Sequence, residues 1–244
     1  MENNKLLKNI SNINTKTVMI CFPFAGGGAS AYMNWTNKLD KSISLCPVQL
    51  PGREERFIEP AFTSMKDAVD ALMVPITTMA REKEIVLYGH SMGARIAYEV
   101  AKELQRKGIN IKYLFVSGSP TPDIPEAMPI YHLNDNEFIE GLKRFDGTPK
   151  EILENQELIS VFLPMLRADF TLIDTYCEDE ITVLNCPIMS FGGDSDNDAK
   201  PDEIREWCKC TNGSFDYKIY SGGHFFIKEH EDDILSIINH ALYV

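Results

Sequence analysis

The chain has 244 residues, of which 44% are hydrophobic, and its formal net charge at pH 7 is −12. This length and hydrophobic content suit one globular domain with a substantial core. The acidic balance argues against non-specific nucleic-acid binding, which needs a basic surface, and no apolar run approaches the ~18 residues needed to cross a bilayer.

The beginning of the chain is polar. Residues 1–16 lack the apolar core and small-residue cleavage site of a signal peptide, so we expect a cytoplasmic protein. The six cysteines are then expected to be reduced. No group of cysteines and histidines has the spacing of a zinc site, so we expect no metal. Separately, we favour a monomer, although the sequence leaves the oligomeric state open.

Apolar runs and helical periodicity alternate along the chain. In chain order they predict strands at 17–24 and 44–52, a helix at 64–82, a strand at 84–91, a helix at 92–107, strands at 113–119, 186–193 and 215–223, and a helix at 230–242. Most of the strand runs are continuously apolar, which is typical of a parallel sheet covered by helices on both faces. The alternation predicts a doubly wound α/β fold.

Residues 122–183 interrupt this rhythm, because they contain helical segments and no convincing strand pattern. An ordinary pair of sheet-packing helices is one interpretation. The segment is too long for a single crossover, however, and a helical insertion between two strands of such a sheet often covers the carboxyl edge. We therefore expect one domain over residues 1–244, with a helical lid at 122–183.

The segment "YGHSMG" places Ser91 in the pattern G-x-S-x-G, between a predicted strand and a predicted helix. That context is the one in which the pattern forms a nucleophile elbow. Glycines on either side allow a turn too sharp for larger side chains. At the start of the helix, the N–H of Met92 can point at an oxyanion.

A serine nucleophile needs a base, and the expected order along the chain is serine, acid, histidine. His224 follows the last predicted strand and two glycines, so we expect it to be the base, whereas His90 lies inside the elbow as a supporting residue. The acid is expected after the preceding strand, in "FGGDSDND". We prefer Asp196 there and keep Asp194 as the alternative.

The glycine-rich stretch "FPFAGGGAS" follows the first predicted strand. We expect the N–H of Ala25 to be the second oxyanion donor, since a loop at this position supplies one in such folds. A phosphate-binding loop is the other interpretation. The stretch lacks the Gly-Lys-Ser/Thr ending of a P-loop and does not match G-x-G-x-x-G, so we expect no nucleotide cofactor.

Together, "CFPFAGG", "QLPGREER", "YGHSMG", "FLPMLRADF" and "FGGDSD…GGH" resemble the type II thioesterases. The resemblance runs from about residue 17 to the end. It implies an α/β-hydrolase fold, with a mostly parallel sheet between helices and a helical lid. It also implies a stand-alone hydrolase that removes acyl or aminoacyl groups from the 4′-phosphopantetheine arm of carrier proteins of peptide or polyketide synthases. By position, Ser91, Asp196 and His224 are the triad, and no bound cofactor is needed.

Two motifs keep alternative interpretations. In "LPGREER", Arg53 or Arg56 contacts the phosphate of the arm, or they form ion pairs with Glu54 or Glu55, which we prefer. Side chains of "FLPMLRADF" either line an acyl channel or pack the lid on the core; the candidates for the substrate site are Phe24, Phe162, Met165 and Leu166. A carboxylesterase or lipase acting on small esters would use the same triad and is the alternative function.

Overall fold

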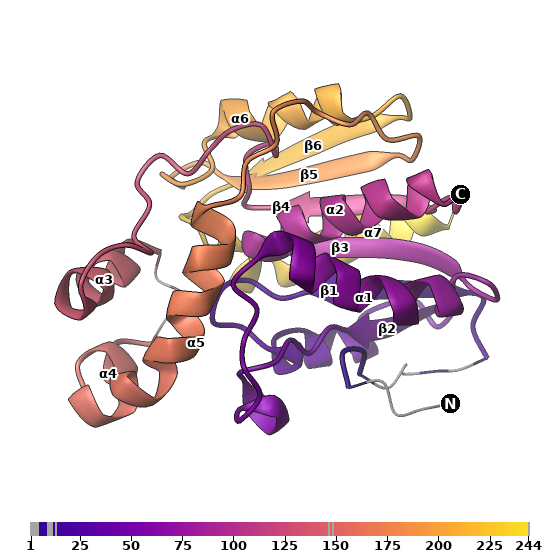
Figure 1. Ribbon diagram of the computed structural model, residues 1–244. Coiled ribbons are helices and arrows are strands. Elements are labelled where there is room, and N and C mark those ends of the chain that lie inside the picture. Colours follow the sequence, from indigo (N-terminus) through magenta and orange to yellow (C-terminus); the bar gives the residue numbers. More distant parts are fainter. Residues whose placement is uncertain (1–4, 9–11, 13, 146, 148, 244) are drawn as a thin grey trace.

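The computed structural model describes residues 5–8, 12, 14–145, 147 and 149–243 (Figure 1). Its centre is a six-stranded sheet with the order β2-β1-β3-β4-β5-β6, in which every neighbouring pair is parallel. The strands are β1 (Thr17–Phe22), β2 (Ile43–Pro47), β3 (Glu84–His90), β4 (Tyr113–Ser117), β5 (Ile188–Gly193) and β6 (Phe215–Tyr220). All six strands that the sequence predicts are confirmed.

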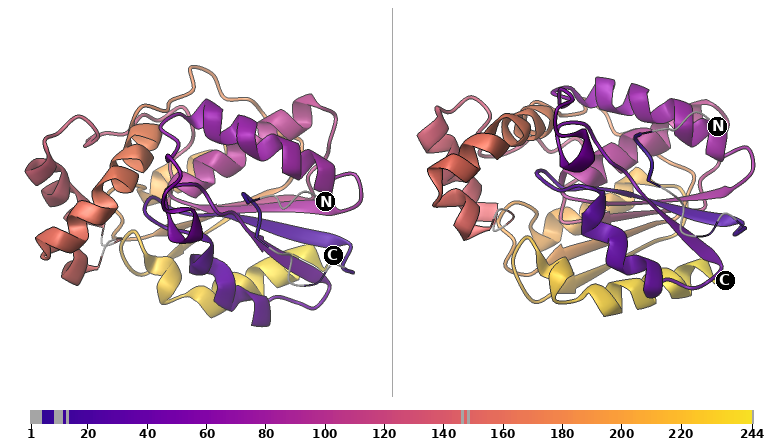
Figure 2. Two further views of the ribbon diagram at one scale, coloured as in Figure 1. Left: turned by 60° about the horizontal axis from the view of Figure 1, so that its bottom comes forward. Right: turned by 90° about the horizontal axis from the view of Figure 1, so that it is seen from below.

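Helices cover both faces of the sheet (Figure 2). One face carries α1 (Met65–Met79) and α2 (Met92–Arg106), and the other carries the 3-10 helix η1 (Ala29–Asn37) and α7 (Glu231–Leu242). Within β1, Val18 and Ile20 belong to the core under α1 and α2, whereas Met19 and Cys21 belong to the core under η1 and α7. Burial on both faces explains why the strand sequences are continuously apolar.

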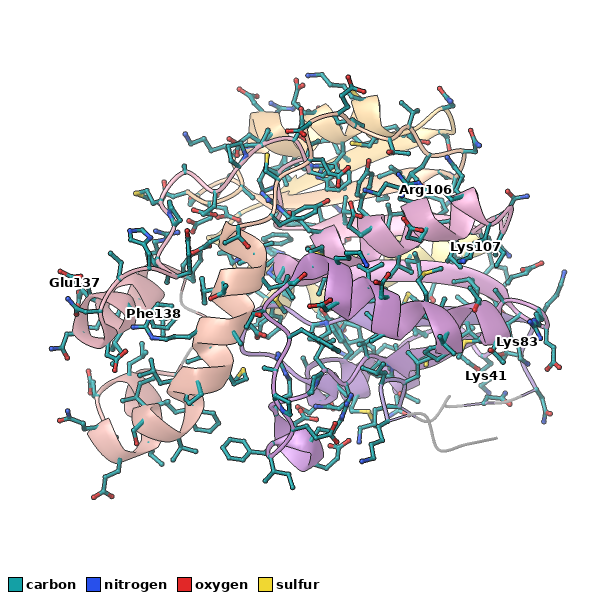
Figure 3. All side chains as sticks on the ribbon, viewed as in Figure 1. Lys41, Lys83, Arg106, Lys107, Glu137 and Phe138 are labelled. Atoms are coloured by element: carbon teal, nitrogen blue, oxygen red, sulfur yellow. The ribbon has the colours of Figure 1, made fainter. Side chains whose placement is uncertain are left out.

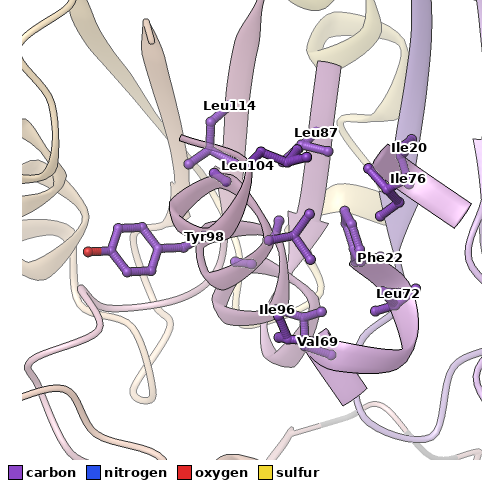
Figure 4. Packing of buried hydrophobic residues seen from close by; sticks show 14 of the residues in the cluster. Ile20, Phe22, Val69, Leu72, Ile76, Leu87, Ile96, Tyr98, Leu104 and Leu114 are labelled. Atoms are coloured by element: carbon purple, nitrogen blue, oxygen red, sulfur yellow. The ribbon is translucent and has the colours of Figure 1, made fainter. Parts of the chain in front are cut away.

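Helix α2 is the most deeply buried helix of this arrangement. Ile96, Val100 and Leu104, spaced four residues apart, are fully buried. Figure 4 shows Ile96 and Leu104 together with Leu87 of the neighbouring strand. Because α2 begins directly after Ser91, this packing fixes the position of the serine.

The insertion between β4 and β5 is helical, as predicted. It holds α3 (Asp135–Leu142), the 3-10 helix η3 (Lys143–Phe145), α4 (Lys150–Leu153) and α5 (Gln156–Asp174), and no strand occurs among its described residues. Its side chains, such as Phe138 and Phe170, form a core cluster of their own. Glu137 and Phe138 lie at one end of the molecule, and Lys41 and Lys83, which precede strands β2 and β3, lie at the other (Figure 3). The insertion therefore lies at the carboxyl edge of the sheet.

Some short elements carry no sequence signal that predicts them. The 3-10 helices η1 and η2 (Glu54–Arg56) follow β1 and β2, and α6 (Pro201–Arg205) with η4 (Glu206–Cys210) lies between β5 and β6; η5 (Phe226–Lys228) precedes α7. In α6 only Ile204 is buried, so no apolar period exists there. None of the described helices combines the length and apolar character needed to span a bilayer.

Candidate active site

Ser91 occupies a strained turn between β3 and α2. Its φ of 56° and ψ of −120° are unusual for a residue with a side chain. A Cβ at Gly89 would lie 2.1 Å from the carbonyl oxygen of Gly93, and a Cβ at Gly93 would lie 2.1 Å from that of Phe22. Since both obstacles are backbone atoms, only glycine fits at either position. The N–H of Ser91 is held by the carbonyl oxygen of Ser117, at 2.8 Å.

Three side chains from separate loops form one hydrogen-bonded chain at this edge. Nε2 of His224 lies 2.9 Å from Oγ of Ser91, and Nδ1 of His224 lies 2.9 Å from Oδ2 of Asp196. The loops follow β3, β5 and β6, and the carboxyl ends of parallel strands share one edge of a sheet. Asp196 and His224 are buried, and Ser91 is partly exposed. This arrangement suits proton transfer from the hydroxyl to the imidazole.

Asp196 is oriented by the backbone of its own loop. Its Oδ1 accepts hydrogen bonds from the N–H groups of Asp198, at 2.9 Å, and Ala199, at 3.3 Å. The other carboxylate oxygen is therefore presented to His224. These bonds fix the direction of the carboxylate as well as its place.

Asp194, the alternative acid, has a different role. It is exposed and accepts from the N–H of Gly222 and the hydroxyl of Ser195, and these bonds lower the pKa of its carboxyl group. Among the described residues, its side chain has no hydrogen bond to His224. Asp194 thus fastens the β5 loop to the β6 loop, and Asp196 is the carboxylate that contacts the imidazole.

The two expected oxyanion donors are free to donate. Met92 is the first residue of α2, where N–H groups have no partner within the helix. In the described part of the chain, neither its N–H nor that of Ala25 donates to a protein acceptor. Ala25 lines the same pocket as Ser91. Backbone donors beside an accessible serine can stabilise a developing alkoxide.

The pocket at Ser91 lies between the sheet edge and the insertion. It is lined by Phe24, Ala25, Ser91, Arg95, Gly118, Ser119, Pro120, Glu126, Leu142, Phe145, Gly147, Phe170, Ile173, Asp174, Asp198, His224 and Phe225. The lining therefore combines aromatic rings with charged groups. Burial raises the pKa of Asp174 to about 6, and burial also raises the pKa of Asp198.

The predicted substrate residues fall into two places. Phe24 lines the pocket at Ser91 and also a second pocket, which Phe162 and Met165 line together with Gly26–Gly28 and Phe57. Leu166 is buried in the core of the insertion. The part of α5 that reaches Ser91 is its last turns, through Phe170 and Ile173. Helical spacing alone does not say which turn lies over the serine.

The sequence analysis did not identify several residues that line the pocket at Ser91, and Arg95 is the clearest example. It is buried on α2 and donates to the carbonyl oxygens of Tyr176, at 3.1 Å, and Ile124, at 2.9 Å. Burial lowers the pKa of its guanidinium. Arg95 thus ties both ends of the insertion to the sheet-covering helix. An arginine next to Ile96, in an otherwise apolar stretch, was the available signal.

His90 contacts Ser117 rather than Ser91. Its Nδ1 lies 2.9 Å from Oγ of Ser117, and its ring packs 5.2 Å from that of His224. Complete burial lowers the pKa of His90 well below its usual value, so the ring is neutral at pH 7. A neutral, fixed imidazole at this place supports the ring of His224 without adding a competing charge.

Asp196, Asp198 and His224 also bring ligand atoms within 4.8 Å of one another, as in a metal site. The hydrogen bond between Asp196 and His224 already uses one such atom from each. Within this cluster, Asp196 and His224 are therefore arranged for hydrogen bonding to each other.

Ion pairing proved the better interpretation of "LPGREER", although the partners differ from those expected. Arg53 pairs with Asp169, and Arg56 pairs with Glu59 at 2.6 Å. Both arginines are buried, so neither guanidinium is available to a phosphate at the surface. Neither Glu54 nor Glu55 is their partner.

The chain is similar to known thioesterases in sequence and in fold. The family model described as "Thioesterase domain" matches residues 17–242. GrsT, a gramicidin S biosynthesis protein of Aneurinibacillus migulanus, is 37% identical over 232 residues, which cover 93% of this chain and 90% of GrsT. LgrE of Brevibacillus parabrevis, named linear gramicidin dehydrogenase, is 37% identical over 236 residues, which cover 93% of this chain and 88% of LgrE.

A solved structure is similar along the whole chain. The type II thioesterase BorB from the borrelidin biosynthetic cluster superimposes with a TM-score of 0.87 at 31% identity, covering 99% of both chains. The name of LgrE describes redox chemistry, whereas the family model, BorB and the serine–histidine–aspartate geometry all agree on hydrolysis.

Proposed function

Because the chain belongs to the thioesterase domain family, we propose that it is a type II thioesterase. Its substrates in this proposal are acyl or aminoacyl thioesters on the 4′-phosphopantetheine arm of carrier proteins of non-ribosomal peptide or polyketide synthases. The observation that carries the hydrolytic mechanism is the continuous hydrogen-bonded chain from Ser91 through His224 to Asp196, at 2.9 Å for each link; family membership favours thioesters over small esters.

In the first half of the reaction, Ser91 becomes acylated. Nε2 of His224 takes the hydroxyl proton while Oγ of Ser91 attacks the thioester carbon, and Asp196 stabilises the imidazolium that forms. The N–H groups of Ala25 and Met92 stabilise the oxyanion. Loss of one such donor typically lowers the rate ~100- to 1000-fold.

The first half ends when the carbon–sulfur bond breaks and the thiol, with a pKa near ~8.5, leaves with the proton held by His224. In the second half, the acyl group is released from Ser91. A water molecule then gives a proton to His224 and attacks the acyl-serine. Collapse of the second intermediate returns the proton to Ser91 and frees the carboxylic acid. Every step uses groups of this chain, water and substrate, so we propose a reaction without a metal or bound cofactor.

The two pockets suggest how the substrate lies. We assign the acyl group to the pocket at Ser91, beneath the insertion 122–183, which we propose to be a lid. We assign the pantetheine arm to the second pocket, which shares Phe24 with the first. Phe57, which lines the second pocket, is 46% exposed, so an arm lying there leads outward to its carrier protein.

Intact-mass analysis of several acylated carrier proteins, incubated with the enzyme, tests the proposal. We expect loss of the acyl mass with retention of the phosphopantetheine mass, and no reaction with Ser91→Ala. A fluorophosphonate probe should label the wild type, and should label neither Ser91→Ala nor His224→Ala. Higher kcat/KM on p-nitrophenyl esters than on acyl-carrier thioesters would favour a general carboxylesterase instead.

The setting of the reaction is part of the same proposal. Carrier proteins of such synthases receive their arm and acyl groups inside the cell, so we propose a cytoplasmic enzyme. We further propose that it works as a monomer, since all groups of the hydrogen-bonded chain and both pockets belong to one chain.

A further inference from the structure

The two motifs whose roles the sequence left open meet in the structure. Arg53 of "LPGREER" and Asp169 of "FLPMLRADF" form a two-armed ion pair: Nη1 lies 2.8 Å from Oδ2, and Nη2 lies 2.7 Å from Oδ1. Arg53 is 4% exposed and Asp169 is 1% exposed. Both groups are therefore shielded from water, although 116 residues separate them.

This ion pair also holds the glycine-rich loop. Oδ2 of Asp169 accepts from the N–H of Gly26 at 2.8 Å, and Nη1 of Arg53 donates to the carbonyl oxygen of Gly27 at 3.0 Å. Gly26 is the residue directly after Ala25, one of the proposed oxyanion donors. The pair thus fastens the loop from two directions, one through an acceptor and one through a donor.

The backbone at Gly26 makes the loop sensitive to this attachment. Its φ of +80° lies in the left-handed region, and a Cβ there would lie 2.9 Å from Cδ2 of Leu166. Glycine is free to leave this conformation, so an external bond must keep it. The bond from the Gly26 N–H to Asp169 fixes the peptide plane that follows Ala25, and so limits where the N–H of Ala25 can point.

Stability alone is a weak reason for such a pair. Burying two charges has a large desolvation cost, and apolar residues of similar volume often give an equally stable protein. Placement of a reacting group is a stronger reason, because an error of ~1 Å can lower a rate ~100-fold.

We infer that Asp169 is a positioning residue for the oxyanion loop, with Arg53 as the counterion that completes its attachment. Through Asp169, helix α5 of the insertion is joined directly to the reaction centre. The inference rests on the proposed acyl-serine mechanism. It assigns to Asp169 an effect on the transition state that is much larger than its effect on substrate binding, although Gly26 and Gly27 also line the second pocket.

The test compares three variants with matched chemistry. Asp169→Asn removes the charge and one acceptor, and Asp169→Leu combined with Arg53→Met removes both charges without leaving either one unpaired. Glu99→Gln is the control, because Glu99 forms another buried ion pair, with Lys102 at 2.7 Å, away from the glycine-rich loop. Thermal unfolding reports on the fold of each variant.

Two analogues separate positioning from binding. A trifluoromethyl ketone analogue of an acyl-pantetheine forms an adduct with Ser91 that needs the oxyanion donors, whereas the matching thioether has no carbonyl and does not. For Asp169→Asn we expect kcat to fall ~100-fold, with KM within about threefold of wild type. Affinity for the ketone should fall by a similar factor, whereas affinity for the thioether should stay within about threefold of wild type.

The double variant and the control complete the design. The double variant should unfold near the wild-type temperature and still have low kcat, because Gly26 lacks its acceptor, and Glu99→Gln should keep kcat within about threefold. Unchanged ketone affinity in Asp169→Asn, normal kcat in the double variant, or an equal loss in Glu99→Gln would overturn the inference. Hydrolysis of p-nitrophenyl butyrate is measured in parallel with each variant. If the wild type hydrolyses esters but not thioesters, the proposed substrate is wrong, and the role of Asp169 can still be tested with the ester.

Discussion

Replacing Asp196 with asparagine should disable the base while leaving the shape of the site intact. In the native loop, Oδ1 of Asp196 accepts from the N–H groups of Asp198 and Ala199. The amide oxygen of asparagine must take that place, so its NH₂ group faces Nδ1 of His224. Nδ1 then has to accept, which puts the ring proton on Nε2, facing the hydroxyl of Ser91 that it should deprotonate.

The magnitude follows from the geometry of the pair. In the transition state, His224 carries a positive charge 2.9 Å from Oδ2 of Asp196. With an effective dielectric constant of about 20, two unit charges at that distance attract by about 6 kcal/mol. Losing this attraction corresponds to a decrease in kcat of about 10⁴-fold, and the wrong tautomer acts in the same direction.

The assay is kcat on an acyl-carrier thioester, with thermal unfolding to confirm that the variant folds. The matched control is Asp194→Asn in the same loop, whose side chain bonds to Gly222 and Ser195 instead of His224. We expect this control to retain kcat within about tenfold, because it only loosens a turn. A loss below ~100-fold for Asp196→Asn, or an equal loss for Asp194→Asn, would refute the reasoning.

Three further predictions concern other parts of the fold. Gly93→Ala should lower the free energy of unfolding by at least ~2 kcal/mol, because the new Cβ would overlap the carbonyl oxygen of Phe22. Urea unfolding measures this free energy, and a decrease of less than ~1 kcal/mol would contradict the prediction. Phe162→Ala should raise KM about tenfold for acyl-pantetheine substrates and leave KM for p-nitrophenyl acetate unchanged, and equal effects on both would reject the second pocket as the site of the arm. Asp174→Asn should stabilise the protein at pH 8 and not at pH 4. Burial raises the pKa of Asp174 to about 6, above the unfolded pKa near ~4. The native state therefore loses about 1 kcal/mol of stability as the pH rises through this range, after allowance for partial exposure. Thermal unfolding of wild type and variant at both pH values tests this, and equal effects of the substitution at pH 4 and pH 8 would contradict it.

The sequence determined the sheet and the nucleophile largely through local signals. Each strand is buried on both faces, so its apolar run is continuous and can be recognised without its neighbours. The elbow at Ser91 is equally local, because Gly89 and Gly93 are required by contacts within and beside one turn. His224 could be chosen because parallel strands direct their following loops to one edge. The catalytic roles of these residues remain predictions for the variants described above.

The tertiary structure decided every question that depends on the direction of a side chain. Asp194 and Asp196 are two residues apart in one acidic loop, and only the backbone bonds of that loop turn Asp196 toward His224. The partner of Arg53 lies 116 residues away, whereas the nearby Glu54 and Glu55 were the natural expectation. The turn of α5 that reaches Ser91 likewise depends on how the insertion packs. Hydrophobic periodicity records which face of an element is buried, but the partner across a contact is set by packing between distant segments, which no short stretch of sequence encodes.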